Sequence, residues 1–338
     1  MLEKPDLRED RLVACLHQAY GMLVSQVDFL PLGADLNTAV YRVVADAGRA
    51  FFCKLRSGVF DETSAALPKY LRDQGIRPII APLATQAGQL WTGLDAYTVI
   101  LYPYIEGRNG REVALSEQQW REFGTALKRI HTVALPAGLQ ARIRQETYSP
   151  RWRNVVRAFL ERIDVERFVD PVARALTAYM RDKRKQIADL VARAEQLAQV
   201  LIAQPRARVL CHSDVHGSNL LIGADGSLYI VDWDDPILAP KERDLMYVGG
   251  AQGFVGYTAQ EEGTLFYRGY GRTLVDPFEL AYYRYERIVE DIAVYCEQLL
   301  LSDEGGPDRE QSLIYFKSNW DPDGTIEVAY GSDKTSMQ

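Results

Sequence analysis

The sequence has few cysteines, and none of them form a recognisable motif. Its four cysteines are far apart and include no CxxC pair: Cys15, Cys53, Cys211 and Cys296. Such spacing is typical of free thiols in a reducing compartment and argues against a disulfide framework. The chain also lacks the run of about 18 apolar residues that a transmembrane helix requires. The N-terminal segment MLEKPDLRED is charged and has no apolar core, so we expect no signal peptide and a cytoplasmic location.

The chain has no excess of positive charge. Lysine and arginine number 39 against 46 aspartates and glutamates, which gives a net charge of −7. Nucleic-acid binding needs basic stripes, so we expect neither nucleic acid nor a membrane as a partner. A small cationic partner suits an acidic protein better. The length of 338 residues, with 47% hydrophobic and 25% charged residues, indicates an ordinary globular protein of two lobes, and we expect a monomer or weak dimer.

Strand-like patterns dominate the first hundred residues. Alternation and β-branched residues predict strands at 24–30, 38–44, 50–55 and 97–105, and a helix is predicted near 61–73. The sequence Asp46-Ala47-Gly48 is a hairpin signal between the second and third strands. After Gly107 the pattern becomes helical, beginning with Ser116 as a helix cap.

These patterns predict an α+β fold with two lobes. We place an antiparallel-sheet lobe with one inserted helix at residues 1–102 and a mainly helical lobe at 103–338, with a hinge at about 102–107. The last residues, GSDKTSMQ after Tyr330, have no apolar periodicity and are predicted to be disordered.

The most informative motif is HSDVHGSN, residues 212–219, which is followed by YIVDWD, residues 229–234. A hairpin signal at Asp225-Gly226 brings Asn219 and Asp232 together, because one begins the first strand and the other ends the second. Phosphoryl transfer needs a carboxylate that accepts a hydroxyl proton and oxygen ligands that hold Mg²⁺ on the phosphates. We interpret Asp214 as the catalytic base, and Asn219 and Asp232 as the Mg²⁺ ligands.

Two other interpretations of this loop remain. Asp214 and Asn219 can hydrogen-bond a tight loop without any catalytic role. His212 and His216 lie four residues apart, as in some zinc sites, but the chain has only four histidines and the usual clustered spacing is absent. We expect both histidines to brace the loop.

A nucleoside triphosphate, ATP or GTP, is the phosphoryl donor that this chemistry implies, and Lys54 is the predicted phosphate clamp. The alternation of a strand puts Phe51, Cys53 and Leu55 of FFCKL on one face and Lys54 on the other. Glu62 is its expected partner, with Asp61 as the competitor.

No Walker or GxGxxG sequence is present. The turn over the phosphates is therefore expected at 33–38, with backbone amides near Asn37 and Thr38. Around the hinge, the carbonyl of Pro103 and the N–H of Ile105 are predicted to bind the nucleotide base.

These residues together resemble the aminoglycoside phosphotransferase family, whose fold is like that of protein kinases. The resemblance rests on Lys54, Asp214, Asn219 and Asp232 and extends over nearly the whole chain. Three longer stretches look like the spectinomycin kinases of that family: YSPRWRNVVRAF from Tyr148, APKERDLMYVGG from Ala239 and YYRYERIVEDIAVY from Tyr282. Many relatives carry glycine at the position of Ser213.

The resemblance implies transfer of a nucleotide γ-phosphoryl group to a hydroxyl of an aminocyclitol or aminoglycoside, with spectinomycin as the expected acceptor. Kinases of other antibiotics, amino alcohols or sugars share the catalytic residues, and a nucleotide-binding protein without turnover is a further alternative. A protein kinase is disfavoured, because only ten residues separate Asp232 from Arg243 and leave no room for an activation segment.

Acidic residues near the C-terminus are candidates for the acceptor site. Between Glu279 and Glu304 there are seven acidic residues and two arginines. Ile288, Ile292, Tyr295 and Leu299 form the predicted buried stripe of a helix, which puts Glu286, Glu290 and Glu297 on a solvated face. Asp291 lies at the flank of the stripe and either binds a cationic acceptor or pairs with Arg287. Glu290 and Asp234 are further candidates for the acceptor site.

Overall fold

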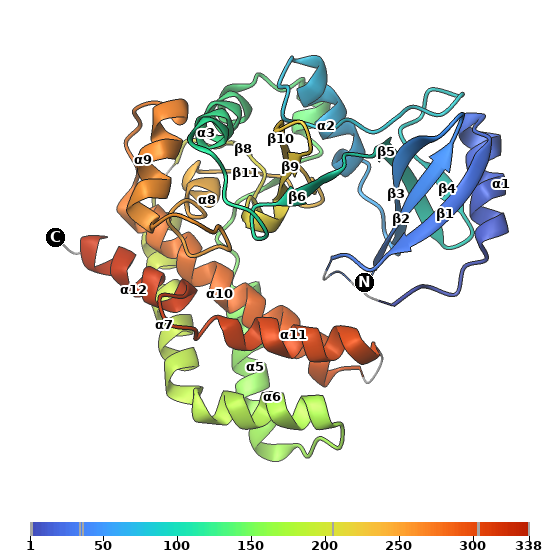
Figure 1. The fold of residues 1–338 in the computed structure, drawn as a ribbon. Helices are drawn as coiled ribbons and strands as arrows, with labels where there is room; N and C mark the ends of the chain where they lie inside the picture. Colours follow the sequence, from blue (N-terminus) through green and yellow to red (C-terminus); the bar gives the residue numbers. More distant parts are fainter. Residues whose placement is uncertain (1–2, 34, 36, 205, 303–304, 337–338) are drawn as a thin grey trace.

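The computed structural model describes residues 3–33, 35, 37–204, 206–302 and 305–336, and it consists of two lobes (Figure 1). The N-terminal lobe contains strands β1 (Val24–Leu30), β2 (Thr38–Ala45), β3 (Arg49–Ser57), β4 (Thr92–Leu94) and β5 (Tyr97–Pro103). They form one sheet in the order β1-β2-β3-β5-β4, and each pair is antiparallel. Helix α1 (Glu9–Tyr20) covers the face of this sheet that is turned away from the helical lobe (Figure 1).

The strand alternation determines which side chains face α1. Cys53 and Leu55 of β3 are fully buried in a core with Leu12 and Leu16 of α1. Successive strand residues point to opposite faces, so Lys54 points away from this core and toward the other lobe. Asp46 and Ala47 have φ of 45° and 65°, the left-handed values of a tight hairpin turn, so the predicted turn between β2 and β3 is confirmed.

Helix α2 (Thr63–Asp73) follows β3 in the chain but packs on the helical lobe. Its buried side chains Leu67 and Leu71 belong to the large core of that lobe rather than to the core under α1. Arg129 of the helical lobe donates to the carbonyls of Gln74 and Gly75 just after α2, at 3.0 and 2.8 Å. The predicted boundary between lobes near residue 102 stays a prediction.

The C-terminal lobe is mainly helical. Its helices are α3 (Glu117–Thr132), α4 (Ala137–Gln140), α5 (Arg151–Val165), α6 (Pro171–Asp182), α7 (Arg184–Ile202), the 3₁₀ turn η1 (Gly217–Asn219), α8 (Glu242–Leu245), α9 (Ala259–Tyr270), α10 (Pro277–Leu300), α11 (Gly306–Ser318) and α12 (Thr325–Ser336). Its short strands are β6 (Gly107–Asn109), β7 (Arg144–Gln145), β8 (Val209–Cys211), β9 (Leu220–Gly223), β10 (Leu228–Ile230) and β11 (Ile237–Ala239). They form two three-stranded sheets, β10-β9-β6 and β7-β11-β8.

Sequence signals account for several of these boundaries. Ser116 begins α3 with a reciprocal capping box to Gln119, as predicted for a cap. The hairpin β9–β10 turns at the predicted Asp225-Gly226. The predicted disorder of the last residues is wrong for 331–336, because α12 continues to Ser336 and Asp333 is held by Arg193 at 2.7 Å.

Within the described residues, no helix is long and apolar enough to cross a membrane.

Candidate active site

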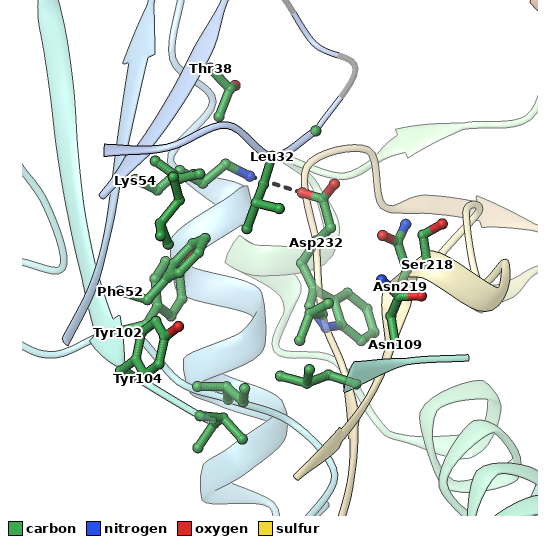
Figure 2. A pocket seen from close by; sticks show the side chains of 18 of the residues that line it. Leu32, Thr38, Phe52, Lys54, Tyr102, Tyr104, Asn109, Ser218, Asn219 and Asp232 are labelled. Atoms are coloured by element: carbon green, nitrogen blue, oxygen red, sulfur yellow. Dashed lines mark hydrogen bonds and ion pairs between the residues drawn. The ribbon is translucent and has the colours of Figure 1, made fainter. Parts of the chain in front are cut away.

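A cavity of 480 Å³ lies between the two lobes. Its N-lobe wall includes Phe52 and Lys54 of β3, and its C-lobe wall includes Asn219 and Asp232, which flank the β9–β10 hairpin. Figure 2 shows Lys54 pointing across the cavity to Asp232, with Tyr102 and Tyr104 at the other end. Pro103 and Ile105 also line the cavity, so the predicted base-binding hinge borders it. Their hydrogen bonds to a base stay a prediction.

Asp214 is held by partners that differ between its two oxygens. Oδ1 accepts from Arg287 at 2.7 Å and lies 3.2 Å from the Tyr247 hydroxyl oxygen. Oδ2 has longer contacts, 3.3 Å to the Asn219 amide nitrogen and 3.4 Å to His216 Nε2. Burial raises the pKa of Asp214, but the charge of Arg287 and the hydrogen bond from His216 outweigh it and hold that pKa well below its usual range. Asp214 is therefore an ionised acceptor with Oδ2 less engaged.

Buried groups brace the loop that carries Asp214. Asp244 of α8 is fully buried and accepts from the backbone N–H groups of His212 and Ser213, at 2.9 and 2.7 Å. His212 Nε2 donates to the Val231 carbonyl at 2.9 Å, so its Nδ1 is the acceptor for the Asp214 N–H at 3.2 Å. Both ring nitrogens of His212 are thus engaged, as expected for a bracing residue, and a zinc site at His212 is disfavoured.

One other group has the composition of a metal site. Ligand atoms of His131, Cys211 and Asp244 lie within 4.8 Å of one another, and all three residues are buried. However, His131 contacts Asp244 at 2.9 Å through Nε2 and the Tyr270 hydroxyl at 2.7 Å through Nδ1. Because both imidazole nitrogens are used, this group supports the loop through Asp244 rather than binding a metal.

Two residues of the site, Ser213 in the loop and Asp232 after β10, have unusual backbone angles. Ser213 has φ of 74° and Asp232 has φ of 66°, in the left-handed region that costs non-glycine residues energy. A glycine adopts such a φ without this cost. Here the strained conformation is held by the Ser213 hydroxyl, which donates to the Asp235 carbonyl at 2.6 Å, and by the Tyr247 hydroxyl, which donates to the Ser213 carbonyl at 2.6 Å.

Asn219 and Asp232 present a donor set that suits Mg²⁺. The Asn219 amide nitrogen donates to the Asp214 carbonyl at 2.8 Å. The amide oxygen takes no part in this bond and is left as a candidate ligand. Asp232 contributes a carboxylate at the cavity wall, and the charge of Lys54 lowers its pKa, so it is an anion. Amide and carboxylate oxygens are the ligands that Mg²⁺ prefers, so the predicted pair fits the ion.

Lys54 has different partners from those predicted. Its ammonium group donates to Asp232 at 2.8 Å and to Asp234 at 2.7 Å. Glu62 instead pairs with Arg142 at 2.9 Å and is half-exposed. The reason is the packing of α2 on the helical lobe, which carries Glu62 with it. The predicted Lys54–Glu62 pair is therefore wrong for this structure, as is Asp61 as its competitor, since Asp61 caps the Thr63 N–H at 2.8 Å.

The predicted phosphate-covering turn is only partly described, because Ala34 and Leu36 lie outside the described residues. The Asn37 N–H donates to Asp35 Oδ1 at 2.9 Å, and the Thr38 N–H donates to the Asp35 carbonyl at 3.3 Å. Both predicted amides are thus engaged with Asp35 in this structure. Thr38 lines the cavity, as does Asp35.

The predicted acceptor carboxylates divide into two groups. Asp291 contacts Arg287 Nε at 3.0 Å, and Glu290 lies 3.6 Å from Arg243, so both are on the Arg287 side of Asp214. Burial, partly offset by Arg287, raises the pKa of Asp291 to about 6. Asp234 lies instead in the cavity between the lobes with Lys54, and its acceptor role stays a prediction.

Helix α10, which carries Asp291, is anchored to α5 by buried polar groups. Arg153 of α5 is 1% exposed and bonds Glu286 at 2.5 Å, while Tyr148 donates to Glu279 at 2.7 Å. Glu286 is therefore buried, and its predicted place on a solvated face is wrong, because α5 covers that side of α10. Two of the stretches that resemble the spectinomycin kinases meet at these contacts.

Sequence reasoning missed three residues around the site. Arg287 was considered only as a partner of Asp291, and Tyr247 and Arg56 were not considered. Arg56 of β3 contacts Asp234 at 2.6 Å. Its position two residues after Lys54 puts both side chains on the same face of the strand, which was a usable signal. Arg287 and Tyr247 lie in stretches that resemble relatives, but only the fold brings them to Asp214.

Comparisons with known proteins agree with this geometry. The model of the phosphotransferase enzyme family matches residues 28–283. The structure of spectinomycin phosphotransferase APH(9)-Ia with ADP and spectinomycin is 37% identical, with a TM-score of 0.90 over 98% of this chain and 100% of that chain. Its AMP complex gives 37% identity and a TM-score of 0.85, over 95% and 98% of the two chains. An amicoumacin kinase at 18% identity and a TM-score of 0.61, over 97% and 94%, shares the fold. A search of curated proteins finds no match.

Proposed function

The chain belongs to the phosphotransferase enzyme family and has the protein-kinase-like fold, and from this premise we propose that it phosphorylates spectinomycin. As an enzyme of this family, it is a phosphotransferase with a hydroxyl acceptor. The observation that carries the choice of spectinomycin is the full-length similarity to a kinase solved with ADP and spectinomycin, at 37% identity over 98% of this chain. An amicoumacin kinase and an aminopropanol kinase, which are named for other acceptors, are 18% and 13% identical and support the fold alone.

The residues of the cavity have distinct roles in the proposed reaction. The acceptor hydroxyl oxygen attacks the γ-phosphorus of ATP or GTP, the bond from that phosphorus to the β–γ bridging oxygen breaks, and the nucleoside diphosphate leaves. Asp214 Oδ2 takes the hydroxyl proton, because Oδ1 already accepts from Arg287 and lies beside the Tyr247 hydroxyl oxygen. Lys54 binds the phosphates. Mg²⁺ held by Asn219 and Asp232 would neutralise phosphate charge.

Acceptor recognition rests on the charge around Asp214. Asp291 and Glu290 lie on one helix beside the base, and each has an arginine within 4 Å, at 3.0 and 3.6 Å. A cationic acceptor brings ammonium groups that compete with these arginines for the carboxylates. We propose that Asp291 binds an amine of the acceptor, since it directly neighbours Arg287. We place the protein in the cytoplasm, because all four cysteines are free thiols.

The test is a product assay with an acceptor panel. The protein is incubated with Mg²⁺ and ATP or GTP, plus spectinomycin, an aminoglycoside, a macrolide, an amino alcohol or a neutral sugar, and nucleoside diphosphate release is measured. We expect the largest rate with spectinomycin and a product heavier by one phosphoryl group. Asp214→Asn is the matched control, because it keeps the shape of the side chain but removes the base.

The outcomes separate the candidate functions. Another amine as the best acceptor would replace spectinomycin while keeping the kinase. Nucleotide binding with no product for any acceptor would favour a binding protein without turnover, against which the complete set of Lys54, Asp214, Asn219 and Asp232 argues.

A further inference from the structure

Two cations of β3 share one carboxylate from the opposite lobe. Lys54 Nζ and an Arg56 guanidinium nitrogen both contact Asp234 Oδ2, at 2.7 and 2.6 Å. Lys54 also contacts Asp232 at 2.8 Å, so two carboxylates hold its ammonium group. The side chains of Lys54, Arg56 and Asp234 are 10%, 21% and 24% exposed. These ion pairs join the sheet of the N-terminal lobe to the loop after β10.

The shared carboxylate has a consequence for nucleotide binding. Lys54 must leave at least one carboxylate before its ammonium group can bind phosphate oxygens. If Lys54 were the only partner of Asp234, its departure would leave a partly desolvated carboxylate without a cation, which is unfavourable. Arg56 already contacts the same oxygen, so Asp234 remains paired when Lys54 moves away.

We propose that Arg56 is a positioning residue that holds Asp234 and thereby releases Lys54 to the phosphates of the nucleotide. The inference rests on the proposed phosphate-binding role of Lys54, and not on the identity of the acceptor. It also assigns Asp234 a role in setting the availability of Lys54, in place of the acceptor role expected from the sequence. Arg56 acts through Asp234 and does not itself contact the phosphates.

This role predicts an unusual dependence between two substitutions. In Arg56→Met, Lys54 is the one close cation that the described residues leave to Asp234. Asp234 therefore retains Lys54, and nucleotide binds about tenfold more weakly. In Arg56→Met with Asp234→Asn, the carboxylate charge is gone and Lys54 is free again. The double variant therefore binds nucleotide within about threefold of the wild type, although it carries one more substitution than the weak variant.

The experiment is isothermal titration of ATP and of GTP into the full chain, with and without Mg²⁺ and in the absence of acceptor. The proteins are the wild type, R56M, R56K, D234N, R56M/D234N and R56K/D234N. Arg49→Met is the matched control, because Arg49 lies on the same strand but is 71% exposed and pairs only with Asp46, at 3.4 Å, among the described ion pairs. R56K retains the positive charge and should bind within about threefold of the wild type. Melting temperatures report whether each variant is folded.

Each outcome bears on the proposal. Weak binding in R56M that D234N restores, with R49M unchanged, supports it. Weak binding in both R56M and the double variant overturns it in favour of a direct contact between Arg56 and the phosphates. Unchanged nucleotide binding in folded R56M also overturns it. If R56M does not fold, the comparison is made with lysine at this position. Weak nucleotide binding in both R56K and R56K/D234N then overturns the proposal. A wild type that binds neither nucleotide would refute the kinase proposal as well.

Discussion

Replacing Arg153 by methionine should unpair the polar groups that fix α10 against α5. The guanidinium contacts Glu286 at 2.5 Å, Glu195 at 3.1 Å and the Tyr148 carbonyl at 2.9 Å. Methionine fills a similar volume but donates no hydrogen bond. Arg153 is 1% exposed, so water cannot replace the lost partner, and Glu286, whose pKa burial already raises to about 7, is left as a buried carboxyl group without its cation.

The expected loss of stability follows from this burial. Removing one partner of a buried ion pair costs about 3–5 kcal/mol. At about 2–4 °C per kcal/mol for a unit of 150–250 residues, the size of the helical lobe, the melting temperature should fall by about 6–20 °C. Glu286→Gln in the same protein should recover part of this loss, because a buried amide needs no cation, whereas the buried carboxyl group must take up a proton once Arg153 is gone.

Scanning calorimetry at neutral pH is the assay, and Arg157→Met is the control. Arg157 lies on the same helix and contacts the same Glu195 at 3.2 Å, but its side chain is 44% exposed. A surface pair of this kind contributes about 0–1 kcal/mol. The reasoning is refuted if Arg153→Met loses no more stability than Arg157→Met, or if Glu286→Gln makes the Arg153 variant worse.

Three further predictions concern the catalytic carboxylates and one buried acid. Asp214→Asn should lower kcat by about 10²–10⁴-fold with nucleotide affinity nearly unchanged, measured by product formation and titration; an unchanged kcat would reject Asp214 as the base. Asp232→Asn should remove most of the effect of Mg²⁺ on nucleotide affinity, and equal Mg²⁺ dependence before and after the substitution would reject Asp232 as a ligand. Burial raises the pKa of Glu279 from 4.5 to about 7, so the native state binds its proton more tightly than the unfolded state does. The stability from this group is complete below pH 4.5 and is lost as pH rises through 7, by about 3 kcal/mol at most. Glu279→Gln should therefore make the melting temperature fall less between pH 5 and 8 than it does in the wild type. If the wild type and the variant give parallel curves of melting temperature against pH, the raised pKa of Glu279 is contradicted.

Much of the fold followed from local patterns. The strand alternation around Lys54, the hairpin at Asp46-Ala47-Gly48 and the cap at Ser116 depend on neighbouring residues only, and each is found in the structure. The C-terminal tail was mispredicted, because its helix depends on a distant partner, the contact of Asp333 with Arg193. Local periodicity carries no information about such a partner.

The sequence by itself determined the chemical inventory of the site: Asp214, Asn219 and Asp232 at fixed spacing, and Lys54 on the cleft-facing side of its strand. Only the tertiary structure decided which charges meet. Because α2 packs on the helical lobe, Glu62 forms an ion pair with Arg142, and Lys54 pairs with Asp232 and Asp234 instead. In the same way, α5 buried Glu286 with Arg153, while α10 brought Arg287 to Asp214. The physical reason is that ion pairs form across distances in the chain that periodicity cannot span, and burial by distant elements selects the partner of each charge.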